Sequence, residues 1–95
     1  MIDYKYFMSS IIKQKSFDFA VSIVRLCKKL VKEKREYVLR KQLLRSGTTI
    51  GALVRGAFAK LLADFIHKLG IAQKETDETC YWIELLNTTE VIDRQ

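Results

Sequence analysis

The side chains of this 95-residue sequence that could do chemistry are few and stand at helical spacing. Asp64 and His67 form a carboxylate-x-x-His pair, the spacing with which di-iron and di-manganese bundles hold their metals. Such a site needs a second pair of this kind and two further carboxylates facing inward, yet the chain contains one histidine. We therefore expect no metal, and we interpret His67 as a helix-surface residue beside Lys68.

Two further carboxylate pairs, Glu33/Glu36 and Glu75/Glu78, also stand three residues apart. No nucleophile with a neighbouring base accompanies them, so a solvated face or an ion-pair partner explains them better than an acid–base dyad. Glu75 and Glu78 lie beside an apolar stripe, and a partly buried carboxylate requires a cation. We predict that Arg45 supplies it across two helices. The sequence thus predicts no catalytic residue, no cofactor and no enzyme.

The two cysteines, Cys27 and Cys80, lack the CxxC spacing or further partners of a zinc site or a disulfide scaffold. Free thiols suit a reducing compartment. No apolar run approaches the roughly 20 residues that cross a bilayer, and the amino-terminal region lacks a small-residue cleavage site. We expect a cytoplasmic protein without a membrane segment.

Positive charge is concentrated in the first two thirds of the chain. Residues 1–60 hold 14 Lys and Arg against 4 Asp and Glu, and residues 61–95 hold 3 against 7, within a net charge of +6. Either a basic face binds nucleic acid or another polyanion, or basic and acidic helices pack together within or between copies. No DNA- or RNA-reading motif is present, so binding would address backbone charge. The candidate nucleic-acid-binding residues are Arg25, Lys28, Lys29, Lys32, Lys34, Arg35, Arg40 and Lys41.

Apolar residues recur every three and four positions, which is typical of amphipathic helices, and proline is absent. The pattern predicts an all-α fold, an antiparallel up-down bundle in a single domain, 1–95. Its helices are expected at 17–34, 37–57 and 61–88, with an N-terminal helical arm at 1–14. Ser16 is the expected N-cap of the first helix, and residues 56–60 are the expected second turn. The expected core stripes are Phe19, Ala20, Ile23, Leu26, Cys27 and Leu30, then Leu39, Leu43, Ser46, Ile50, Leu53/Val54 and Ala57, then Leu62, Phe65/Ile66, Leu69, Ala72, Thr76, Thr79, Ile83 and Leu86.

Three residues have expected structural roles within these helices. Gly47 and Gly51 are four apart on one face, and each glycine costs a helix interior roughly 1 kcal/mol relative to alanine. Close approach of another helix would offset that cost. Trp82 is assigned to packing, because the neighbouring Glu78 and Glu84 would repel a phosphate.

Three segments of the sequence resemble the small bacterial four helix bundle protein family, whose founding members are encoded in intervening sequences of large-subunit ribosomal RNA genes. They are LLRSGTTIGA at 43–52, ADFIHKL at 63–69 and ETDETCYWIELL at 75–86, within a match over residues 11–90. The resemblance implies a four-helix bundle that assembles into a ring-shaped homopentamer. The accessory variability determinants of diversity-generating retroelements look like relatives. They are basic, and they bind a reverse transcriptase and nucleic acid.

The sequence departs from the family pattern at Leu53, where asparagine is usual, and at Gly56, where glutamate is usual. It also ends at Gln95, where a fourth helix would begin, so we expect that helix to be truncated or missing. An apolar strip with Tyr81, Trp82 and Leu85-Leu86 would then favour a homo-oligomer.

Two functions remain open. The first is a non-enzymatic homo-oligomeric bundle that binds RNA or DNA as a retroelement-type accessory protein, with a reverse transcriptase as partner. The alternative is a structural or protein-interaction module with no nucleic-acid role.

Overall fold

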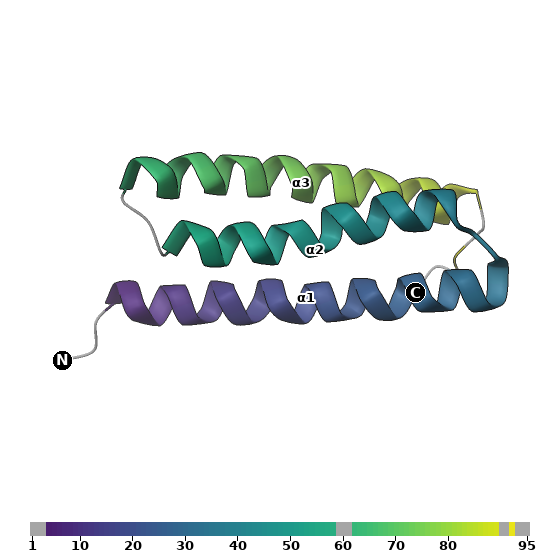
Figure 1. The fold of residues 1–95 in the computed structure, drawn as a ribbon, viewed down its shortest axis with the longest axis horizontal. Coiled ribbons are helices and arrows are strands. Elements are labelled where there is room, and N and C mark those ends of the chain that lie inside the picture. The colour runs from purple at the N-terminus through teal and green to yellow at the C-terminus, as the bar shows by residue number, and fades with distance from the viewer. Residues whose placement is uncertain (1–3, 59–61, 90–91, 93–95) are drawn as a thin grey trace.

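The computed structural model describes residues 4–58, 62–89 and 92. Three α-helices make up these residues: α1 (Tyr4–Lys34), α2 (Val38–Phe58) and α3 (Leu62–Thr88). Successive helices run antiparallel, and α2 lies between α1 and α3 and packs against both (Figure 1). The 31 residues of α1 extend about 46 Å at 1.5 Å per residue, which is nearly the whole 49 Å length of the molecule. The predicted all-α bundle is confirmed. None of the helices in the described part of the chain is long and apolar enough to cross a membrane.

The first helix begins much earlier than predicted. The structure joins the expected arm at 1–14 and the expected helix at 17–34 into one continuous α1, which starts at Tyr4. Ser16 is therefore not an N-cap. Its hydroxyl donates a hydrogen bond to the backbone carbonyl of Lys13 at 3.1 Å, so the helix accommodates the serine through bonding to its own preceding turn.

Residues 35–37 turn the chain from α1 into α2. Arg35 adopts a left-handed backbone conformation with φ of 51°, the geometry that commonly ends a helix. The carboxylate of Glu36 then accepts hydrogen bonds from the backbone N–H groups of Val38 and Leu39, at 3.1 and 3.0 Å. A negative side chain at these free N–H groups stabilises the start of α2.

The second connection lies later than predicted. Gly56 belongs to α2, which continues to Phe58, and α3 begins at Leu62. The connection therefore falls on residues 59–61, which lie outside the described part of the chain.

The core gathers apolar residues from all three helices. Its buried cluster consists of Ile23, Cys27 and Leu30 of α1, Leu43 of α2 and Leu86 of α3. In α2 the predicted stripe continues along the helix, and its buried members are Leu43, Ser46, Ile50, Val54 and Ala57.

Three residues depart from the predicted burial. Phe19 is 36% exposed, Ile66 is 64% exposed, and Thr76 is also exposed. Helical spacing identifies a stripe but not its width, and these residues lie at the edges of theirs. Leu86 was predicted both on the core stripe of the third helix and in an apolar strip with Tyr81, and it is fully buried, which agrees with the core stripe. The apolar strip expected around Tyr81 and Trp82 therefore does not include Leu86.

Candidate nucleic-acid interface

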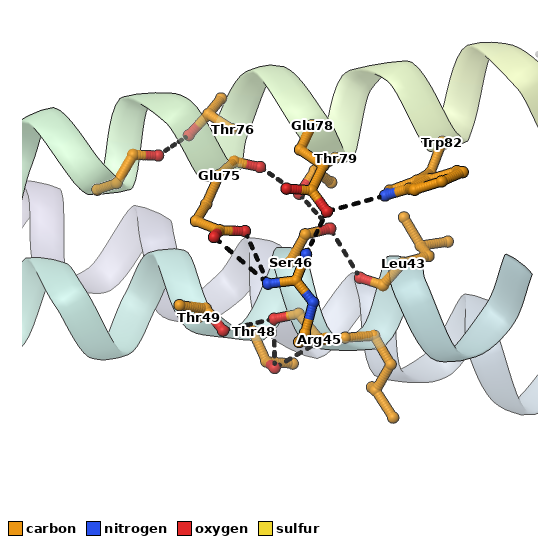
Figure 2. A network of polar contacts seen from close by, with 12 residues as sticks. Leu43, Arg45, Ser46, Thr48, Thr49, Glu75, Thr76, Glu78, Thr79 and Trp82 are labelled. Atoms are coloured by element: carbon orange, nitrogen blue, oxygen red, sulfur yellow. Dashed lines mark hydrogen bonds and ion pairs between the residues drawn. The ribbon is translucent and has the colours of Figure 1, made fainter.

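Arg45 of α2 joins two carboxylates of α3 (Figure 2). Its Nη1 atom lies 3.2 and 3.3 Å from the two carboxylate oxygens of Glu75, and its Nη2 atom donates to Oε1 of Glu78. The same Glu78 oxygen accepts a hydrogen bond from the indole Nε1 of Trp82 at 3.3 Å. The structure thus places the predicted cation on the predicted carboxylates. It also gives Trp82 a polar partner, in addition to its packing against the core cluster.

A pair of buried hydroxyls lies beneath this network. Ser46 of α2 and Thr79 of α3 are both fully buried, and their hydroxyl oxygens are 2.8 Å apart. Thr79 also lies 2.7 Å from the backbone carbonyl of Glu75, and Ser46 lies 3.4 Å from that of Leu43. The sequence placed both residues on core stripes but did not predict their contact. The sequence feature that could have indicated this contact is a hydroxyl residue at a core position in each of two adjacent stripes.

Gly47 and Gly51 of α2 face α1. A Cβ atom at Gly47 would lie 2.8 and 2.9 Å from the Cγ1 and Cγ2 atoms of Ile23, which is closer than real contacts allow. At Gly51 the nearest atom would be the backbone oxygen of Ser16, at 3.4 Å. The close approach expected from the glycine spacing is therefore to α1, and Gly47 is the tighter of the two positions.

Four of the candidate cations form one row along α1. Arg25, Lys28, Lys29 and Lys32 follow the i, i+3, i+4, i+7 spacing of a single helix face, and all four are exposed. The buried residues of α1 occupy its other side. We call these four residues the α1 cation row.

The remaining four candidates lie apart from this row. Lys34 ends α1, Arg35 belongs to the turn, and Lys41 is exposed on α2. Arg40 is only partly exposed, because it lies in a groove between α1 and α2. Among the described residues none of the eight candidates forms an ion pair with a carboxylate, whereas Arg45 binds two.

Apart from Glu75 and Glu78, which both bind Arg45, the residues considered for metal or acid–base chemistry form no site with one another in the part of the chain that the structure describes. Asp64, His67 and Glu33 are exposed, and Glu36 caps α2. Within residues 4–58, 62–89 and 92, no three His, Cys, Asp or Glu residues are grouped so that they could hold a metal ion.

Comparison with known proteins places this arrangement in a family. The family model described as 23S rRNA-intervening sequence protein matches residues 8–95. This chain belongs to the 23S rRNA-intervening sequence protein family. The resemblance found in the sequence is thereby confirmed. No curated protein matches the chain.

One solved structure is similar to this intervening-sequence protein over most of its length. It is a protein of unknown function from the S23 ribosomal protein family of Bacteroides thetaiotaomicron, 55% identical to this chain. The match covers 90% of this chain and 78% of that chain, with a TM-score of 0.88. The fold is therefore shared with an experimentally determined member of the same group of proteins.

In this intervening-sequence protein the Arg45 network shifts the titration of its members. The hydrogen bond from Trp82 and the neighbouring Arg45 guanidinium lower the pKa of Glu78 below its ordinary value, against the opposing effect of burial. The pKa of Arg45 is raised, chiefly by its hydrogen bond to Glu78. Because these groups are exposed to solvent, their contribution to stability is modest.

Because of this network, we predict that the free energy of unfolding depends on whether Glu78 is ionised. Its pKa is lower in the folded than in the unfolded protein, so the stabilisation is complete above the unfolded pKa of about 4.3 and is lost as the pH falls through the folded pKa. We expect Glu78→Gln to lower the melting temperature at pH 7. The difference from the wild type should shrink towards pH 3, in thermal unfolding followed by circular dichroism.

Glu84→Gln is the matched control, because Glu84 is exposed on the same helix and makes no ion pair among the described residues. It should follow the wild-type pH profile. A Glu78→Gln difference that stayed constant from pH 7 to pH 3 would contradict this interpretation.

Proposed function

We propose that this protein binds nucleic acid through the α1 cation row, without catalysing a reaction on it. The observation that supports the proposal is the row itself: four exposed cations on consecutive turns, with no carboxylate partner among the described residues. From Arg25 to Lys32 the helix rises about 10 Å. That length matches about three phosphates of one strand at 3.4 Å each.

Backbone charge is the proposed target, so binding has little sequence preference. We further propose a homo-oligomer, a pentamer by family resemblance, in which each copy contributes one cation row. The unequal charge of residues 1–60 and 61–95 supports contact between unlike faces of neighbouring copies. By the same resemblance the proposed protein partner is a reverse transcriptase, and the free thiols support a cytoplasmic setting.

The test is a double charge reversal within the row. Arg25→Glu/Lys29→Glu should leave helicity unchanged, because both residues are exposed, and it should strongly weaken binding to a fluorescent RNA or DNA 20-mer. If the two cations contact phosphates, the slope of log K against log salt should shrink by about two. Fluorescence anisotropy between about 50 and 200 mM salt measures both quantities.

Lys15→Glu/Lys74→Glu is the matched control, since it makes the same net charge change at exposed positions outside the row. It should retain most of the affinity. Equal losses in both variants would show that net charge, not the row, attracts the nucleic acid. Absence of wild-type binding at about 50 mM salt would overturn the proposal and leave the protein-interaction alternative.

Light scattering on the same samples gives the oligomer mass, and a mass of about 11 kDa would contradict the ring.

A further inference from the structure

A groove of about 410 Å³ lies between α1 and α2. Val24, Cys27 and Val31 line it from α1, and Leu44 lines it from α2. Burial raises the pKa of the Cys27 thiol more than the nearby Arg40 charge lowers it, so these four residues form an uncharged, apolar part of the lining. The volume is within the usual range for small-ligand sites, about 300–1,000 Å³.

Three cations complete the lining of this groove. Lys28 and Lys32 belong to α1, where they are also members of the α1 cation row, and Arg40 belongs to α2. The Nε atom of Arg40 is buried without a hydrogen-bond partner among the described residues. A buried donor of this kind carries a desolvation cost until an acceptor reaches it. None of the described residues that line the groove is a carboxylate, so an anion bound there would offer this donor an acceptor.

The groove and the row together favour a polymeric anion with an apolar part. Arg25 and Lys29 do not line the groove but are exposed on the same stretch of α1, so the positive charge of Lys28 and Lys32 extends sideways from the groove onto the surface, which fits a phosphate chain longer than the groove is wide. A nucleic-acid single strand combines such a chain with bases that are free to leave the stack. In a duplex the bases are paired and stacked, so only the backbone is available to a shallow protein surface.

We propose that the groove holds an unpaired base of a single-stranded nucleic acid, with the flanking phosphates on Lys28, Lys32 and Arg40. This inference rests on the proposed function and adds a preference to it, namely single strands over duplexes. The aliphatic lining replaces the aromatic platform used by many single-strand-binding proteins. Contact with one base then adds to the binding affinity that the phosphate charges provide.

The experiment compares a fluorescent single-stranded RNA 20-mer with the same sequence in a perfect duplex, at about 100 mM salt. We expect the wild type to bind the single strand about tenfold more tightly, near the lower end of what a base stacked on an aromatic side chain contributes, because the lining here is aliphatic. Arg40→Gln should remove most of that preference and weaken duplex binding only about twofold. Circular dichroism confirms that each variant is folded.

Lys41→Gln is the matched control, because it removes one positive charge from the adjacent, exposed position on α2. It should weaken both forms equally and leave the preference intact. Val24→Asp provides a second variant, which places a negative charge in the groove and should also remove the preference.

Each other outcome overturns the inference in a distinct way. Equal wild-type affinity for single strand and duplex would leave the proposed function standing and exclude base binding. If Lys41→Gln lost the preference for single strands to the same extent as Arg40→Gln, positive charge alone would explain that preference. Binding of neither nucleic acid, with tight binding of a synthetic Glu/Leu amphipathic helix, would identify the groove as a peptide site and overturn both proposals.

Discussion

Gly47→Leu should lower the free energy of unfolding by about 3 kcal/mol, the upper part of the usual range for overpacking. Even a Cβ atom at this position would lie 2.8 Å from Cγ1 of Ile23. That atom is close to the α1 backbone on a β-branched side chain, which has few rotamers available to move aside. The gain in helix propensity over glycine, under about 1 kcal/mol, is too small to compensate. For a domain of this size the melting temperature should fall by roughly 12–24 °C.

Gly70→Leu is the control for this substitution. Gly70 lies within α3, is exposed, and has no atom within 4 Å of an added Cβ. The same change there should raise stability by about 0.7 kcal/mol through helix propensity. Ile23→Ala should partly relieve the Gly47→Leu penalty in a double-mutant cycle. Additive effects of the two substitutions would show that the contact with Ile23 is not the cause.

Leu86→Ala is expected to cost about 3 kcal/mol as well. Leu86 is fully buried and is the α3 member of the core cluster, together with residues of α1 and α2. Its truncation removes buried methyl groups and leaves a cavity, which typically costs 2–5 kcal/mol. A domain of this length has a total stability of only about 5–14 kcal/mol. Urea unfolding followed by circular dichroism measures the loss.

Leu85→Ala makes the identical substitution at the neighbouring, half-buried position. Less apolar surface is removed from the interior there, so the expected loss is about 1 kcal/mol. Similar losses in the two variants would mean that Leu86 does not join α3 to the other helices in solution.

Features that depend on spacing within one helix could be predicted from the sequence. The core stripe of α2 and the α1 cation row both follow from the helical repeat. The pairing of Arg45 with Glu75 and Glu78 also followed, because a carboxylate beside a core stripe requires a cation and the family segment offered one. The start of α1 was wrong, because a serine at an apparent boundary forms an N-cap or bonds to its own preceding turn with similar ease.

Two other features, which depend on the relative rotation of neighbouring helices, could not be predicted. The contact between Ser46 and Thr79 requires that their stripes meet in register, which no single-helix pattern specifies. Arg40 and Lys41 were both candidate nucleic-acid-binding residues, yet Arg40 lines the groove between α1 and α2 whereas Lys41 lies outside it. The groove is a product of helix packing, so its site was not visible in the sequence.

The central position of α2 has a consequence for how the chain reaches this fold. In the described structure the close backbone approaches between helices join neighbours in sequence, α1 with α2 and α2 with α3. The loop that must close between α1 and α2 is only residues 35–37, so its entropic cost is small. Low contact order of this kind is associated with folding in microseconds to milliseconds. Either hairpin has the local contacts to nucleate folding, and α2 is the element common to both routes.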